Sequence, residues 1–505
     1  MYPFSEPVRQ ALFYVLPAAA LVLALAVPWV ERRGGARARR VHLGLLALTA
    51  LLGFLLWSNQ NWERRRYFNP YEFFHYYVGA KYAPELGYTR LYDAAVLVDR
   101  ETGFVARSND LANLSAHHGE PEFKRRGAVH AEAEAIRAPF TPARWAEFRG
   151  DVVFFREALT PGMWEQLLHD KGYNATPAWT LVGGFLARLL PLESPAFVLL
   201  VLLDPLLLAG GFALVAWAFG LRAMLFAVTL YFTHYVTSHA HFRAAFLRTD
   251  WLVGLVASVC CLAKGRPLLG GAALAWAALS RVFPVLFALG PLGVLVARLR
   301  GPAEARRAAL RFVLGGALLG GTVLALTLAQ GGLEPWREFQ AKIVEHDQRP
   351  ASDTIGFKKV FLWTIDFGQG EAAAIRARFE ERRLLWWSLQ AAAAAGLAFA
   401  LRRRPLDEAL CLSFPFVWLA ASPAYYYYAL LLVPALWGAA RLARPARAVA
   451  LALVFATSLC ARAFHGGPTF QGHFAFKLSL VMGLLAVGLL VCARLERPED
   501  EAPQG

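Results

Sequence analysis

Long apolar runs separated by short basic connections make up most of the chain. Two runs come first, 11–30 and 41–58, and an α-helix needs about 20 mostly apolar residues to cross about 30 Å of hydrocarbon. After a polar segment the runs are 177–192, 195–219, 221–238, 250–264, 268–299, 308–329, 385–401, 408–421, 424–440, 446–463 and 475–494. The pattern predicts an all-α polytopic membrane protein with about 12–14 transmembrane helices.

Two of these runs need a separate interpretation. Run 268–299 is too long for one straight span, and Pro284 removes a backbone donor within it, which predicts two short helices with a break at Arg281–Pro284. Run 177–192 is short and carries Arg188. Forward and backward counts of the topology differ by one crossing in this region. Either 177–192 does not cross the membrane, which we favour, or 268–299 crosses only once.

Arginine clusters fix the predicted topology. Five arginines lie between Glu31 and Arg40, and further basic connections are 298–307, 402–404 and 441–447. Basic connections stay on the cytoplasmic side of a membrane. The segments 59–175, 331–384 and 464–474 and the Ser422-Pro423 turn are expected outside.

The predicted organisation therefore has six parts. The N-terminus has no basic region followed by a cleavage site, so its first apolar run is expected to be a retained helix. The parts are two N-terminal transmembrane helices (1–58), an external loop with amphipathic helices at the interface, near 141–149 and 151–169 (59–175), a transmembrane core (176–330), a second external loop (331–384), C-terminal transmembrane helices (385–495) and a cytoplasmic tail (496–505).

Composition supports the membrane interpretation. Only 18% of the 505 residues are charged, against about 25% in soluble proteins. The net charge of +15 could indicate nucleic acid as a partner, but the arginines lie between apolar runs, so we expect none. The five cysteines lie inside apolar runs without metal-ligand spacing and are expected to pack.

The segment 69–92 is the most informative for chemistry. If it is helical, Glu72, His75 and Tyr76 share one face, since they are three and four residues apart. A carboxylate in a partly dry position can act as a general base. The alternative is a glutamate near a helix start, stabilised by the helix dipole.

The same segment resembles a known family. Glu72, Tyr76, Gly79-Ala80, Gly87 and Leu91-Tyr92 are similar to the first-loop signature of GT-C glycosyltransferases, and most of all to family 87, the polyprenol-phosphate-mannose-dependent α-mannosyltransferases. Further similar stretches follow in order at 173–177, 264–271, 280–284, 336–339, 352–356 and 422–428, so the resemblance covers about 60–460. The chain departs from the family where Glu72 replaces an aspartate, Arg281 replaces a lysine and the 93–172 loop is long.

The resemblance implies an inverting hexosyltransferase. Its donor would be a mannose-like sugar on a polyprenyl phosphate, its acceptor a lipid, glycan or protein, and its general base Glu72. The site would face the periplasm from a bacterial inner membrane. No HExxH or Asp-x-Asp motif is present, so no obligatory metal or other cofactor is expected, although two loop acids could still hold an ion.

Substrate-binding candidates follow from the same reasoning. Arginine forks and other cations suit a leaving phosphate, and tyrosines suit sugars. The candidates are His75, Tyr76, Lys81, Tyr92, Asp250, Arg281, His346, Arg349, Lys358, Tyr425 and Tyr426, with Arg243, Arg248 and Lys359 as further cations.

Each candidate has a structural alternative. Arg281 could pair with Asp250 or Asp204, and the loop cations could contact solvent or headgroups. Tyr425–Tyr428 could form an interfacial aromatic belt. Asp204, inside a span, is either functional, protonated or a cap, and Asp250 is either a helix cap or a second acid of the site.

Two other protein classes remain open. A transporter or flippase of lipid-linked or small solutes should show matching halves with broken helices, and no internal repeat is evident. In a non-catalytic assembly or sensor protein, Glu72 would be replaceable.

Overall fold

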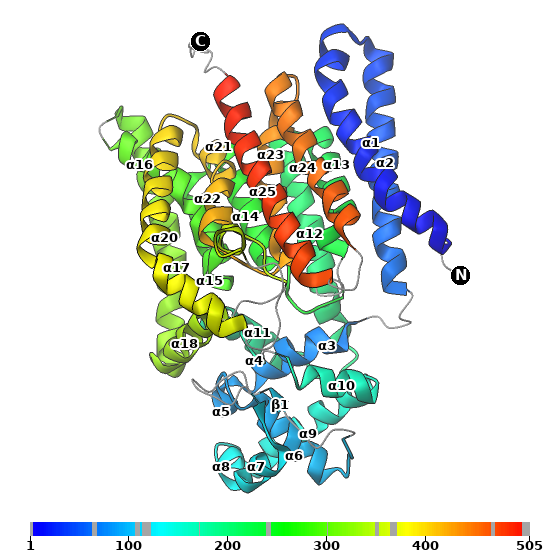
Figure 1. Cartoon of the computed structure of the whole chain (residues 1–505), viewed down its shortest axis with the longest axis vertical. Coiled ribbons are helices and arrows are strands. Elements are labelled where there is room, and N and C mark those ends of the chain that lie inside the picture. The colour runs from blue at the N-terminus through cyan, green and yellow to red at the C-terminus, as the bar shows by residue number, and fades with distance from the viewer. Residues whose placement is uncertain are drawn as a thin grey trace.

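A bundle of apolar helices carries a lobe of shorter helices at one end (Figure 1). The computed structural model describes residues 4–62, 68–106, 112–113, 123–170, 172–238, 244–299, 301–348, 353–363, 371–465 and 470–496. Strand is limited, in these residues, to one antiparallel pair, β1 (Ala112–Asn113) and β2 (Phe123–Lys124). The chain is an all-α polytopic membrane protein, as the apolar runs predict.

Seven helices of the described residues are long and apolar enough to cross a membrane. They are α1 (Glu6–Arg33), α2 (Ala36–Trp62), α12 (Phe197–Phe219), α17 (Ala303–Gly331), α20 (Glu371–Leu401), α24 (Pro445–Phe464) and α25 (Phe470–Leu495). The shorter apolar elements are α13 (Leu221–Thr233), α14 (Asp250–Ala263), α15 (Pro267–Ser280), the 3₁₀ helix η4 (Phe283–Ala288) with α16 (Leu289–Arg298), α21 (Leu406–Cys411), α22 (Phe414–Ala420), the 3₁₀ helices η2 (Tyr235–Ser238) and η5 (Tyr425–Leu431), and α23 (Leu432–Ala440). The total of 12–14 crossings stays a prediction.

The break predicted within 268–299 is present. α15 ends at Ser280, Arg281 is extended, and the 3₁₀ helix η4 carries Pro284 near its start. α11 (Pro177–Leu189) packs against α4 (Gly79–Lys81) of the lobe as well as α15 and α17 of the bundle. It has 13 residues and is about 20 Å long, and that it does not cross the membrane stays a prediction.

The lobe has an apolar core of its own. Its elements are α3 (Pro70–Phe73), the π-helix η1 (Phe74–Val78), α4 (Gly79–Lys81), α5 (Ala83–Leu86), α6 (Leu91–Glu101), α7 (Arg126–Ala131), α8 (Ala133–Arg137), α9 (Pro142–Glu157) and α10 (Pro161–Leu167). Aromatic side chains such as Phe74, Phe155 and Trp164 meet edge to face in this core. The amphipathic pieces expected near 141–149 and 151–169 form α9 and α10, and their apolar faces pack on it.

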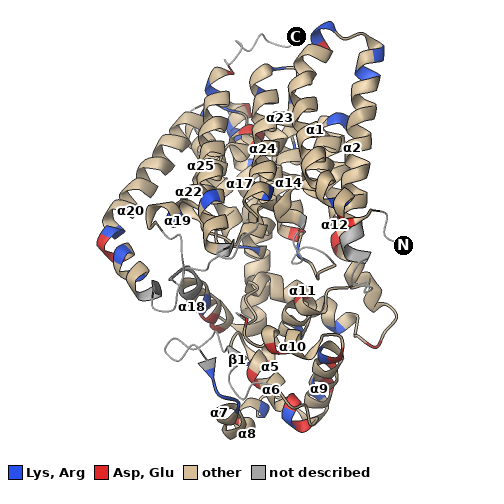
Figure 2. Cartoon of the chain, turned by 45° about the vertical axis from the view of Figure 1, so that its right-hand side comes forward, with Lys and Arg blue, Asp and Glu red and all other residues tan. Residues whose placement is uncertain are grey.

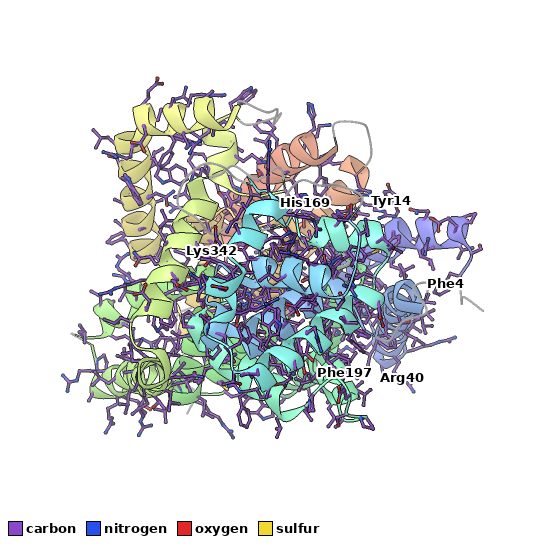
Figure 3. All side chains as sticks on the ribbon, turned by 90° about the horizontal axis from the view of Figure 1, so that it is seen from below. Phe4, Tyr14, Arg40, His169, Phe197 and Lys342 are labelled. Carbon is purple, nitrogen blue, oxygen red and sulfur yellow. The ribbon has the colours of Figure 1, made fainter. Side chains whose placement is uncertain are left out.

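The predicted second external loop (331–384) contacts the same lobe. Glu338 of α18 (Glu334–Gln348) accepts the backbone N–H of Tyr88 at 3.1 Å, and Lys342 donates to the Tyr88 carbonyl oxygen at 3.1 Å. Phe339, between them, is buried in the lobe core. Figure 3 looks at the lobe end on and shows it in front of the centre of the bundle. Tyr14 and Arg40 of the α1–α2 pair, and Phe4 just before α1, lie to one side.

The end of the bundle opposite the lobe is basic (Figure 2). We call this end, formed by the connections 34–35, 264–266, 299–302, 402–405 and 441–444, the basic end. Buried Arg447 donates there to Glu408 at 2.6 Å and to Glu496 at 2.8 Å, which fixes the end of α25 against α21 and α24. The predicted basic connections therefore share one end, and the two large predicted external loops share the other.

Candidate active site

Glu72 lies where the lobe meets the bundle. Pro70 starts α3, the Asn69 side chain accepts the Glu72 backbone N–H at 3.4 Å, and Asn69 itself donates to the Ala244 carbonyl oxygen at 2.8 Å. The Glu72 side chain is buried. A π-helix follows directly, and such wide turns occur often at functional sites.

Arg248 joins Glu72 and Tyr76. Its Nη2 lies 3.4 Å from Glu72 Oε2, its Nη1 donates to the Tyr76 hydroxyl, and its guanidinium stacks 4.4 Å from the centre of the Tyr76 ring. Burial lowers the pKa of Arg248, but the adjacent tyrosines and Glu72 raise it by more, so the guanidinium stays charged. The predicted spacing of Glu72 and Tyr76 is thus realised around an arginine that the sequence suggested only as one loop cation among several.

Asp204 holds the backbone that carries Arg248. It accepts the N–H of Arg248 at 2.9 Å, and from Thr249 both the N–H at 2.8 Å and the hydroxyl at 2.6 Å. Ala244 and Leu247, which precede Arg248 in the chain, both have a positive φ of 50°. This conformation costs a non-glycine residue about 1–3 kcal/mol. α12 continues through Pro205, so Asp204 caps the segment before α14 rather than a broken α12.

Arg281 is a buried cation with unused donors. Its guanidinium carbon lies 5.3 Å from the centre of the Tyr76 ring and 5.7 Å from that of Trp179, and Nη1 donates to the Ser280 carbonyl oxygen at 2.9 Å. Nε and Nη2 have no hydrogen-bond partner among the described residues. A buried polar group without a partner requires an explanation, and a missing ligand is one.

The two acids predicted as partners of Arg281 form no close ion pair with it. Asp250 begins α14 without capping it, and Thr249 takes the cap position. Oδ2 of Asp250 accepts the Ser280 hydroxyl at 2.5 Å, while its Oδ1 has no hydrogen-bond partner among the described residues and is subject to the Arg281 charge from beyond ion-pair distance. In the part of the chain that the structure describes, no carboxylate lies within 4.0 Å of the Arg281 guanidinium. The structural ion pair considered for Arg281 is therefore not formed there.

The tyrosine tetrad divides between two surroundings. Rings of Tyr426 and Tyr427 face the Arg248 guanidinium at 5.6 Å and 5.8 Å. Tyr425 instead packs its ring on Tyr235 and Phe474. Tyr427, which the sequence did not single out, thus belongs to the site more closely than Tyr425. Only the register of the 3₁₀ helix η5 distinguishes them.

His75 and Tyr92 form an adjacent pair. His75 Nδ1 donates to the Tyr71 carbonyl oxygen at 2.9 Å, and its Nε2 lies 2.5 Å from the Tyr92 hydroxyl. Burial lowers the pKa of His75, so the ring is neutral and Nε2 accepts. The backbone N–H of Gly172 also donates to Tyr92, at 2.9 Å. The His75–Tyr92 hydrogen bond therefore joins η1 to α6 within the lobe, next to Glu72.

Lys81 is held within the lobe. Its ammonium lies 2.7 Å from Asp151 and 2.8 Å from Glu147, both on α9, and is almost fully buried. Tyr82 donates to the same Asp151 carboxylate at 2.8 Å. These contacts tie α4 to α9, and the structure gives Lys81 a role in packing rather than a contact with Glu72.

The remaining candidates belong to the predicted second external loop (331–384), apart from Arg243, which precedes α14. Lys358 of α19 (Phe357–Phe361) lies 4.7 Å from the centre of the Phe379 ring, and Lys359 is buried beside it. The side chain of His346 and the residues Arg349 and Arg243 lie outside the described residues. Groups of three His, Cys, Asp or Glu side chains that could hold a metal do not occur in the described ranges.

Helix length sets the depth of the site. α14 and α15 have 14 residues each, about 21 Å, which is less than the hydrocarbon thickness of about 30 Å. Their connection lies at the basic end. Their other ends, which carry Asp250 and Arg281, therefore lie only about 21 Å along the helices from the basic end.

Comparison of the chain with protein-family models, with curated proteins and with solved structures finds no match. The resemblance to GT-C glycosyltransferases consequently stands on its motifs. The function is argued below from the chemistry of the site itself.

Proposed function

We propose that the protein is a membrane glycosyltransferase of GT-C type that transfers a hexose from a polyprenyl phosphate, with inversion and with Glu72 as general base. One observation carries the proposal. Buried Arg281 keeps Nε and Nη2 without partners in the described chain, next to the Glu72–Arg248 pair. Two guanidinium groups beside one carboxylate suit an anionic leaving group and a hydroxyl that must lose a proton.

The depth of the site suits a donor carried by a lipid. Its phosphate would approach Arg281 from the lipid face, and the isoprenoid chain would stay in hydrocarbon. The rings of Tyr76, Trp179 and Tyr427 surround the guanidinium groups, and aromatic faces pack well against sugars. On this proposal the site faces the periplasm from a bacterial inner membrane.

The chemical step is a single displacement. The acceptor hydroxyl gives its proton to the Glu72 carboxylate while its oxygen forms a bond to the anomeric carbon. The bond between that carbon and the phosphate oxygen breaks, and its electron pair stays on the phosphate. Arg281 and Arg248 would bind the charge that develops there, and groups placed in advance for such charge lower the barrier strongly.

The Glu72–Arg248 pair connects donor binding to acceptor activation. Without donor, Arg248 is occupied by Glu72 and Tyr76. A bound phosphate would compete for this guanidinium and loosen its contact with Glu72. The carboxylate would then be available to accept a hydrogen bond from the acceptor hydroxyl, so that proton transfer follows donor binding.

A sugar-transfer assay with purified protein and a polyprenyl-phosphate hexose tests the proposal. Glu72→Gln should lower transfer by about 100-fold or more, yet retain donor binding because both arginines remain. The matched control is Glu157→Gln, an exposed position on α9 of the lobe, which should transfer normally.

Two outcomes would refute it. Near-normal transfer by a folded Glu72→Gln protein would remove Glu72 from the chemistry. Movement of a lipid-linked solute across liposomes, with no sugar transfer by the unaltered protein, would instead establish the transporter or flippase.

A further inference from the structure

A cavity of about 470 Å³ opens at the basic end, away from the site at Glu72. It lies between the α14–α15 connection, the end of α16 and the starts of α17 and α21. Ligand sites commonly have volumes of roughly 300–1,000 Å³. Its charged lining consists of Arg298, Glu304, Arg307, Arg311 and Asp407.

The charge of the lining favours a monoanion. Three guanidinium groups face two carboxylates, which leaves one positive charge in excess. Arg307 and Arg311 are one helical turn apart on α17 and exposed. Within the described ranges neither has a carboxylate within 4.0 Å of its guanidinium. Their charges are therefore available to a ligand.

The surface beside the cavity changes from basic to apolar along one helix face. Leu314 and Leu318 follow Arg311 at spacings of three and seven residues, which places them on the same side of α17. Both leucines are about half exposed, at 50% and 57%. A charged group at the basic end followed by an exposed apolar stripe matches the headgroup and acyl chain of a phospholipid.

We propose that this cavity binds the headgroup of an anionic glycerophospholipid of the phosphatidylglycerol type, from the leaflet at the basic end. Its phosphodiester carries one negative charge, which equals the excess of the lining. Its headgroup hydroxyls can donate to Glu304 and Asp407, and its chains lie along Leu314 and Leu318. A basic pocket between helices at this end of a membrane protein is a suitable lipid site. The proposal is independent of the transferase chemistry.

Native mass spectrometry of the delipidated full-length protein in detergent, titrated with phosphatidylglycerol, tests the site. The double variant Arg307→Gln/Arg311→Gln should weaken binding of the first lipid by about tenfold or more, because charge-assisted hydrogen bonds are lost. The control Arg37→Gln/Arg40→Gln removes the same charge from exposed positions at the start of α2, also at the basic end, and should bind normally. Ala308→Trp, which fills the cavity without changing its charge, should also lose the lipid.

Three further outcomes would contradict the proposed site or its ligand. Equal lipid binding by the cavity variants and the control, with unchanged thermal unfolding, would overturn the site. Tighter binding of phosphatidylethanolamine than of phosphatidylglycerol would overturn the choice of headgroup. Displacement of the lipid by an equal concentration of inorganic phosphate would show that a soluble anion, and not a lipid, is the ligand.

Discussion

Nη2 of Arg248 lies 3.4 Å from Oε2 of Glu72, and both side chains are almost fully withdrawn from solvent. Such a pair loses the hydration of both charges, so burial alone gives it little net stabilising value. Its position between the lobe and the bundle instead gives it a chemical use. The acid and the cation that the proposed reaction needs are in contact before any substrate is bound.

Arg281→Met should weaken donor binding with little loss of stability. The arginine leaves two buried donors without partners in the described chain, at a cost of about 1–3 kcal/mol each. Methionine removes that cost, while buried Asp250 loses a favourable charge. Loss of its contacts to phosphate should lower affinity for a polyprenyl phosphate about 10- to 100-fold. Donor titration and thermal unfolding in detergent measure the two effects.

Arg266→Met is the matched control, because Arg266 lies exposed at the basic end over the Trp217 ring. It should change neither donor affinity nor the midpoint of unfolding by much. A lower midpoint for Arg281→Met, with normal donor affinity, would mean that Arg281 supports the fold and not a ligand.

Local rules of sequence predicted much of this arrangement. Pro284 predicted the helix break after Ser280, and the four-residue spacing of Glu72 and Tyr76 predicted that they share one helix face. Both predictions depend on only a few neighbouring residues. The position of Arg248 depends on a backbone turned by Ala244 and Leu247. Neither residue is a glycine, so the sequence gives no signal for their left-handed conformation.

Long-range contacts explain the other differences. Lys81 binds Asp151 because α9 returns across α4, and hydrophobic periodicity does not show where a helix returns. Likewise, Tyr425 and Tyr427 are equivalent as neighbours in a run, and only their register in η5 turns one toward Arg248. Glu72 could be selected from the sequence, whereas the choice of Arg248 among the candidate cations could be made only from the folded structure.

Asp204→Asn should displace Arg248. The amide keeps one acceptor oxygen and presents N–H donors where an N–H of Arg248 or Thr249 now donates to the carboxylate. We expect a loss of about 1–3 kcal/mol in stability and a raised KM for the donor. Thermal unfolding and transfer kinetics measure both effects. Thr249→Val removes only the hydroxyl donor and should have the smaller effect on each. An equal or larger effect of Thr249→Val would contradict the assigned role of Asp204.

Gly87→Ala should weaken the contact between the lobe and α18. Gly87 has φ of 56°, and an added Cβ would lie 2.7 Å from Glu338 Oε2, the atom that accepts the Tyr88 N–H. We expect a loss of about 1–3 kcal/mol from backbone strain, together with loss of that hydrogen bond. Gly332→Ala has nearly the same backbone angles, φ 65° and ψ −151° against 56° and −150° at Gly87, with open space around the new Cβ, so it isolates the strain. Limited proteolysis of the lobe and thermal unfolding should show the greater effect for Gly87→Ala. Identical effects would mean that the Glu338–Tyr88 hydrogen bond does not hold α18 on the lobe.

Lys359 should make stability depend on pH in the alkaline range. Burial lowers the pKa of Lys359 from 10.5 to about 7, and nearby Asp353 only partly opposes this shift. Below about pH 7 the folded and unfolded chains both carry the proton, so the penalty for burying the charge is complete. Between about pH 7 and 10.5 the folded chain alone releases the proton, and the penalty falls as pH rises.

Lys359→Met removes this group and should be more stable than the unaltered protein at pH 7. The difference in the free energy of unfolding should shrink toward alkaline pH by up to about 1.4 kcal/mol for each pH unit. Thermal unfolding in detergent from about pH 6.5 to 9.5 measures this, because the relevant titration falls in that interval. Lys358→Met, one residue earlier on α19 and only partly buried, should leave the dependence in place. A stability difference for Lys359→Met that stays constant over this interval would mean that Lys359 keeps its proton in the folded protein.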